Sequence, residues 1–149
     1  MLKAQATNYQ SKTLGVVVIS NQTSTTNIAL APLPGSVAGN VSSSTSGDPI
    51  AGASISLSLN GQVVASTLTD AFGNYLFFNI SIGTYTVTAQ ATNYQSQILG
   101  AIVLANQTAT VNFSLILQPG SVIGTVSSSL TDNPIRGALV QLDLISFIS

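Results

Sequence analysis

Side chains able to carry out acid–base, nucleophilic or metal chemistry are scarce in this chain. Its 149 residues include four Asp, two Lys and one Arg, but no His, Cys, Trp or Glu. Without His and Cys there is no imidazole base, no thiolate nucleophile and no typical zinc site. The many Ser hydroxyls would need an activating base to act as nucleophiles. We therefore expect a protein that is not an enzyme and that holds neither a metal nor a cofactor.

Two of the carboxylates lie in the middle of the chain, where both are expected to form turns. Asp48 precedes Pro49, and Asp70 lies in the sequence Thr69-Asp70-Ala71-Phe72-Gly73. Asp side chains stabilise such turns by accepting hydrogen bonds from nearby backbone groups. Calcium usually takes six or more oxygen ligands, often from several carboxylates. Two Asp residues are too few to predict a calcium site.

Asparagine supplies the remaining candidate chemistry, because five Asn-x-Ser/Thr sequons could accept N-linked glycans. Their number is only mildly above what the composition predicts by chance, so their positions matter more. Glycans would help to dissolve a surface with few charges, and the alternative is that these residues are ordinary polar surface groups. The candidates are Asn21, Asn40, Asn79, Asn106 and Asn112.

Composition excludes several classes of partner. Charged residues make up 5% of the chain, against about 25% in an ordinary soluble domain. Three cations cannot form a basic patch for nucleic acid, and no apolar run is long enough to span a membrane. With few groups to titrate, stability should depend little on pH. These features favour an exposed, extracellular setting at the cell surface.

The chain contains an internal repeat with a period of 85 residues. The sequence AQATNYQS at 4–11 returns at 89–96, and PGSV at 34–37 returns at 119–122, with no gap needed. Such self-similarity is typical of tandem repeat proteins. The period predicts one complete repeat at 34–118, the C-terminal part of a repeat at 1–33, and the N-terminal part of another at 119–149. Two explanations of the partial repeats are open: the chain is a stretch of a longer tandem array, or its two ends complete each other between neighbouring molecules.

Apolar and polar residues alternate with a period of two throughout the repeat, which predicts β-strands. Ala53, Ile55 and Leu57, for example, alternate with serines, and Asn60-Gly61 predicts a tight hairpin. We expect seven short strands with an apolar inner face and a Ser/Thr/Asn outer face. The predicted fold is all-β: a seven-stranded immunoglobulin- or transthyretin-like sandwich in 85-residue tandem repeats.

Three motifs make the repeat resemble a known family. They are GNV at 39–41 followed by GDPIAGASI at 47–55, TDAFGNYLF at 69–77, and GTYTVTA at 83–89. With these motifs the repeat resembles the carboxypeptidase regulatory-like domains, transthyretin-like sandwiches related to the Cna-B repeats of surface proteins. The resemblance implies a stalk, spacer, adhesin module or enzyme accessory. Some of these relatives carry a Lys–Asn isopeptide bond, which residues 34–118 cannot form because they contain no Lys.

These observations predict a structural extracellular protein, the repeat unit of a cell-surface fibre, stalk or filament. Its partners would be copies of itself, joined head to tail by strand pairing, because 119–149 and 1–33 supply complementary parts of one sandwich. N-linked glycans are a further expected partner, whereas nucleic acid and a membrane span are not expected. The alternative is a carbohydrate- or protein-binding accessory module of a secreted enzyme or adhesin.

Overall fold

The computed structural model describes residues 1–142, and every regular element in that range is a β-strand. The first two strands, β1 (Leu2–Ala4) and β2 (Lys12–Leu14), form a small hairpin. The other eight strands form a sandwich and follow one another along the chain as β3 (Gly35–Ser43), β4 (Ser54–Leu59), β5 (Gln62–Leu68), β6 (Asn74–Ile80), β7 (Gly83–Gln90), β8 (Gln97–Val103), β9 (Thr108–Thr110) and β10 (Phe113–Leu115).

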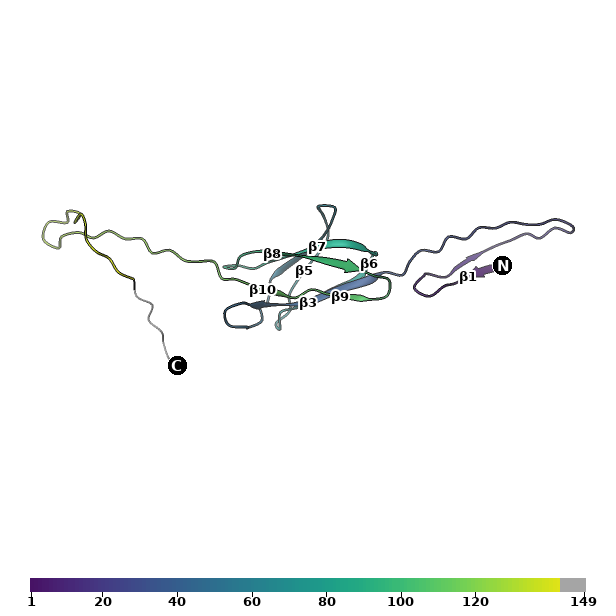
Figure 1. Ribbon diagram of the computed structural model, residues 1–149, viewed down its shortest axis with the longest axis horizontal. Coiled ribbons are helices and arrows are strands. Elements are labelled where there is room, and N and C mark those ends of the chain that lie inside the picture. Colours follow the sequence, from purple (N-terminus) through teal and green to yellow (C-terminus); the bar gives the residue numbers. More distant parts are fainter. Residues whose placement is uncertain (143–149) are drawn as a thin grey trace. The chain divides into compact units, whose positions relative to one another are not determined.

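The sandwich consists of two sheets packed face to face (Figure 1). One sheet has the strand order β5-β4-β7-β8 and is antiparallel throughout. The other is built around β3, which pairs antiparallel with β6 and parallel with both β9 and β10. The prediction of an all-β sandwich is therefore confirmed.

The core of the sandwich comes from alternate residues of nearly every strand, as the period of two predicts. Val37 and Val41 of β3, together with Ile55 and Leu57 of β4, are completely buried. Tyr75 is buried among them, and its hydroxyl donates to the carbonyl oxygen of Val111 (2.6 Å). Burial raises the pKa of Tyr75 to about 12, because the phenolate would lose its solvation.

The last strand of the sandwich is interrupted, so that it forms the two short strands β9 and β10. Between β9 and β10 the backbone departs from regular pairing, although the N–H of Val111 still donates to the carbonyl oxygen of Ala38 (2.8 Å). Gly39 of β3 lies beneath this irregularity, and a Cβ atom there would overlap the carbonyl oxygen of Val111. The absent side chain thus lets the last strand approach β3 closely.

The outer face is more apolar than predicted. Ser and Thr do cover the outside of β4 and β7, but Leu76 and Phe78 of β6 are exposed, and so are Ile98 and Ile102 of β8. Val63 and Leu68 of β5 are exposed as well. The expectation of a wholly Ser/Thr/Asn outer face is wrong for these three strands, and all three lie at the edge of a sheet.

The tight hairpin predicted between β4 and β5 is confirmed. Asn60 and Gly61 both have positive φ angles, of 51° and 80°. A two-residue turn with two positive φ angles matches the twist of the strands that it joins.

By its internal contacts the chain divides into two compact units, Met1–Gln118 and Pro119–Ser149. Residues 143–149, which the sequence analysis assigned to the C-terminal partial repeat, lie outside the described part. Residues 1–142 contain no helix that is long and apolar enough to cross a membrane.

The close approach at Gly39 generates the first prediction. We expect Gly39→Ala to lower the free energy of unfolding by about 2 kcal/mol, because the new methyl group must displace the backbone at Val111. Gly100→Ala on β8 is the matched control, since a Cβ atom there meets nothing within 4 Å. It should change stability by no more than about 0.5 kcal/mol. Urea unfolding measures both, and equal stability of the two variants would contradict this account of the last strand.

Candidate functional site

The N-terminal flank of the sandwich has the local structure of the residues 85 positions later. In the hairpin of β1 and β2, Leu2 pairs with Leu14. In the sandwich, the corresponding pair of β7 and β8 is Val87 with Leu99. The three residue pairs of the small hairpin all keep this register. Residues 1–14 therefore form the same strand pairing without the rest of a sandwich around them.

The same agreement extends to the loops that follow these strands. The N–H of Gln10 donates to the carbonyl oxygen of Ala31 (2.8 Å), as that of Gln95 donates to Ile116 (2.8 Å). In the C-terminal flank, the N–H of Ile135 donates to the carbonyl oxygen of Val126, as that of Ile50 donates to Val41, each at 2.9 Å. The flanks thus contain preformed turns of the repeat.

What the flanks lack is burial of their apolar residues. Val37 and Leu57 are fully buried in the sandwich, but the residues 85 positions later, Val122 and Leu142, are both 83% exposed. Val103 is 1% exposed, whereas Val18, 85 positions earlier, is 79% exposed. Apolar side chains gain about 1.5–3 kcal/mol each when they are fully buried. The flanks are therefore the candidate functional site, because their apolar side chains are exposed where the corresponding residues of the sandwich are buried.

The 85-residue period predicted partial repeats in both flanks, but it did not single out Val18 or Val122 as exposed. Exposure depends on which strands are present to cover a side chain. The available signal is positional: a residue that lies 85 positions from a buried one is expected to require burial too.

Among the sequons, Asn21 and Asn106 lie in equivalent exposed turns, with positive φ angles of 61° and 57°. Asn79 is also exposed with a positive φ, at 59°, near the end of β6. All three residues are exposed, as an acceptor of a glycan must be.

Asn40 and Asn112 are joined across the interrupted strand. The N–H of Asn40 donates to Oδ1 of Asn112 (3.0 Å), so a side chain occupies a place in the ladder that the backbone leaves empty. The Nδ2 of Asn40 also donates to the carbonyl oxygen of Phe72 (2.8 Å) and to Oδ1 of Asn74 (3.1 Å). The alternation places Asn40 on the outer face, but the residue is only partly exposed. Its amide nitrogen already donates two hydrogen bonds.

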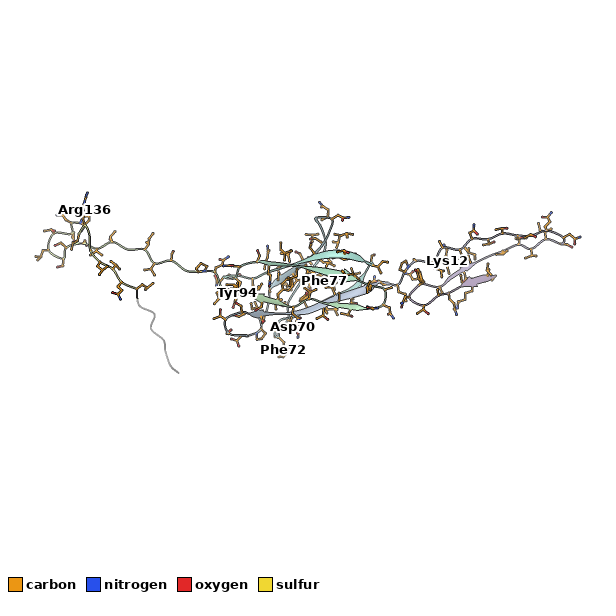
Figure 2. All side chains as sticks on the ribbon, in the orientation of Figure 1. Lys12, Asp70, Phe72, Phe77, Tyr94 and Arg136 are labelled. Carbon is orange, nitrogen blue, oxygen red and sulfur yellow. The ribbon has the colours of Figure 1, made fainter. Side chains whose placement is uncertain are left out.

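Asp70 stabilises the turn between β5 and β6, as its sequence context predicted (Figure 2). Its Oδ1 accepts from the N–H groups of Phe72 (2.9 Å) and Asn74 (2.8 Å). These hydrogen bonds, that from Asn74 foremost, lower the pKa of Asp70 below its ordinary value. The geometry is that of a carboxylate capping a turn.

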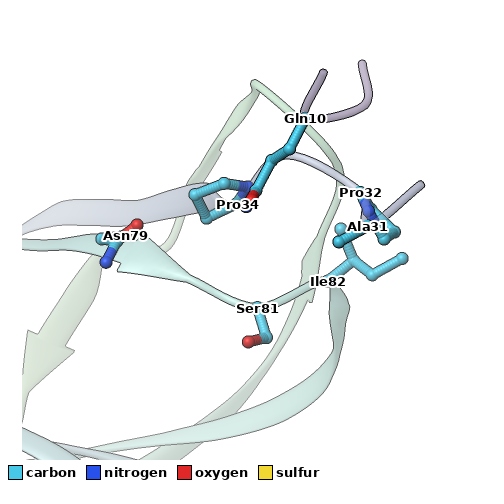
Figure 3. Close-up of a pocket in the computed structure, with 7 residues that line it drawn as sticks. All are labelled: Gln10, Ala31, Pro32, Pro34, Asn79, Ser81 and Ile82. Atoms are coloured by element: carbon cyan, nitrogen blue, oxygen red, sulfur yellow. The ribbon is translucent and has the colours of Figure 1, made fainter. Parts of the chain in front are cut away.

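Within residues 1–142 no group of three or more metal-ligating side chains comes together. A hollow of about 370 Å³ lies beside Asn79 (Figure 3). Its other lining residues carry no formal charge: Gln10, Ala31, Pro32, Pro34, Ser81 and Ile82.

Comparison with known proteins identifies the family. The model of the carboxypeptidase regulatory-like domain matches residues 36–116, which is more than half of the chain. The chain therefore belongs to the carboxypeptidase regulatory-like domain family, as the three motifs indicated. No curated protein sequence matches it.

Several solved structures are similar to this chain at low sequence identity. They include the Bacillus anthracis TIE protein (17% identity, TM-score 0.52). That match covers 59% of this chain and 17% of the TIE chain. A streptococcal ancillary pilin (13%, TM-score 0.50) matches over 78% of this chain and 40% of its own. BcpA, the major pilin subunit of Bacillus cereus (18%, TM-score 0.48), matches over 58% and 31%. The chain thus spans less than half of each of these proteins.

The turn at Asp70 generates a prediction about acid. Because its pKa is lowered on folding from 3.8, ionised Asp70 adds stability above that value, and this contribution is lost as the pH falls through the folded-state pKa. We expect thermal unfolding to show a small decrease in Tm confined to pH values below about 4. Asp70→Asn should remove this decrease.

Asp48→Asn is the control, since Asn133 already stands at the matching position of the C-terminal flank. That variant should keep the acid-dependent decrease in Tm. If Asp70→Asn retained the full decrease, another group would be responsible.

Proposed function

We propose that this chain is a structural, non-enzymatic module of an extracellular cell-surface filament, and that successive copies join head to tail through strand pairing. The observation that carries the proposal is the exposure of core side chains in both flanks, whose turns already have the conformation of the sandwich. Such a surface is costly to leave in water and is suited to another part of the same repeat.

The topology of the complete sandwich indicates how two flanks would fit together. Residues 119–142 correspond to β3 and to the first residues of β4, and residues 1–33 correspond to the later part of β7 and to β8, β9 and β10. In the sandwich, β3 pairs with β9 and β10, and β4 pairs with β7. The pairings between the first and last thirds of the repeat are therefore the ones that two flanks from neighbouring copies would form. In this arrangement each flank adds its strands to the strands of the neighbouring copy.

Two further features support a surface filament. The fold is shared with a streptococcal ancillary pilin, which is a likeness of fold alone. The chain has few ionisable groups and no His or Cys. Its surface would therefore keep its charge state over a wide range of pH, and it has no imidazole to serve as a general base near neutral pH.

Glycans at exposed sequons form the second part of the proposal. Asn21, Asn79 and Asn106 lie on exposed backbone, where a sugar would not disturb the sheets. Glycans there would compensate for the scarcity of surface charge.

Assembly can be tested with two neighbouring residues of the C-terminal flank. Val140 lies 85 positions after the buried Ile55, and Leu139 lies 85 positions after the outward-facing Ser54, yet both are highly exposed in this chain. We expect Val140→Asp to abolish filaments seen by negative-stain electron microscopy, because the charge would enter the composite core. Leu139→Asp should leave filaments intact.

Removal of residues 1–12 should also abolish filaments while the circular dichroism of the central sandwich is kept. If the wild-type chain stays monomeric by light scattering, the alternative of a carbohydrate- or protein-binding accessory module is favoured. Filaments that persist in both Val140→Asp and the truncated chain would overturn the strand-pairing mechanism.

Glycosylation can be tested by glycopeptide mapping of the chain produced in a host that attaches N-linked glycans. We expect sugar at Asn106 and none at Asn40, because a glycan on Nδ2 of Asn40 would break its hydrogen bonds to Phe72 and Asn74. Occupancy of Asn40 equal to that of Asn106 would show that these contacts do not protect the amide. An intact mass equal to the unmodified 15.2 kDa would overturn the glycan proposal.

A further inference from the structure

The first and last strands of the sandwich lie side by side and run in the same direction. β3 begins at Gly35, and β10 ends at Leu115, with Phe113–Leu115 paired to Val41–Ser43. β9 is paired to the beginning of β3 in the same parallel sense. The chain therefore enters this strand pair at one end and leaves it at the other.

This arrangement decides how the sandwich responds to tension along the chain. A pull on the segment before Gly35 and on the segment after Leu115 slides β3 and the β9–β10 strand past each other. All bonds between them are then loaded together and must fail together. If the chain entered and left at the same end, the same bonds would open one after another under a much smaller force.

The contact between these strands is continuous from one end to the other. At the entrance, the N–H of Asn106 donates to the carbonyl oxygen of Pro34 (3.0 Å), and that of Ser36 donates to Gln107 (2.9 Å). At the exit, the N–H of Ser44 donates to Leu115 (2.9 Å).

The interruption in the middle is bridged as well. There the N–H of Val111 donates to the carbonyl oxygen of Ala38, and Oδ1 of Asn112 accepts from the N–H of Asn40 (3.0 Å). The hydroxyl of Tyr75, on β6, donates to the carbonyl oxygen of Val111 and holds the irregular backbone in place.

The inner face of the same strands adds resistance to sliding. Val37 and Val41 of β3 and Phe113 and Leu115 of β10 are buried in the core. Displacing β10 along β3 would pull Phe113 and Leu115 out of their packed positions, at a cost in buried apolar area.

We propose that the pairing of β3 with β9 and β10 is a non-covalent clamp that bears tension along the chain. Residues 34–118 contain neither Lys nor Cys, so no Lys–Asn bond or disulfide within them can carry the load. The use of this clamp under tension rests on the proposed filament function, but its strength is a property of the single molecule and can be measured without assembly.

The loading geometry can be tested by single-molecule force spectroscopy on the full chain. Because the chain has no Cys, handles can be attached through introduced thiols. Ala31→Cys with Gln118→Cys loads the two strands from opposite ends, and Thr45→Cys with Gln118→Cys loads them from the same end. At one constant force, the first pair should unfold much more slowly than the second. Equal unfolding rates in the two geometries would overturn the clamp.

The bridge at Asn112 provides a second test in the opposite-end geometry. Asn112→Ala should unfold about fivefold faster, the factor for one hydrogen bond lost before the barrier is crossed. Asn112→Asp, which keeps an acceptor oxygen, should unfold at the wild-type rate.

Gly61→Ala controls for loss of stability elsewhere. It lowers stability at equilibrium because Gly61 has a positive φ of 80°, but its turn joins β4 and β5 in the other sheet, so its unfolding rate under force should equal that of the wild type. If Gly61→Ala accelerated forced unfolding as much as Asn112→Ala, resistance to force would belong to the whole sandwich and the clamp would be excluded. A monomeric wild-type chain would refute the filament function but would leave these measurements valid.

Discussion

Parallel pairing between the first strand of the repeat and its last strand is the interaction on which the rest of the structure depends. β3 is bonded on one side to β9 and β10 and on the other to β6, so it organises one of the two sheets. Its inward residues, Val37 and Val41, lie at the centre of the core. Because this pairing joins residues more than seventy positions apart, the fold closes only when both ends of a repeat are present.

That requirement explains why similar sequences have different environments in one chain. Val37 and Val122 occupy corresponding positions, and both follow a Pro-Gly-Ser sequence. One is buried because the last strand lies beside it, and the other is exposed because residues 119–142 have no such neighbour within their own unit. Burial is thus set by the partner strand and not by the residue.

Much of the sandwich could be predicted from the sequence, because alternation of apolar and polar residues is a local signal. Ala53, Ile55 and Leu57 were placed correctly in the core for this reason. The interruption at Val111 and the engagement of Asn40 could not be predicted, since both depend on the close approach of strands distant in sequence. The exposed Phe78 was also missed, because alternation alone does not show whether an outer face is polar.

If copies join as proposed, the ordered turns of the two flanks have a consequence for the kinetics of their association. Their backbone already holds the hydrogen bonds that it has in a complete repeat, such as that from Ile135 to Val126. Conformational entropy has therefore been lost before any encounter, and docking need not spend binding free energy on ordering these segments. Flanks prepared in this way would capture one another quickly and in a single register.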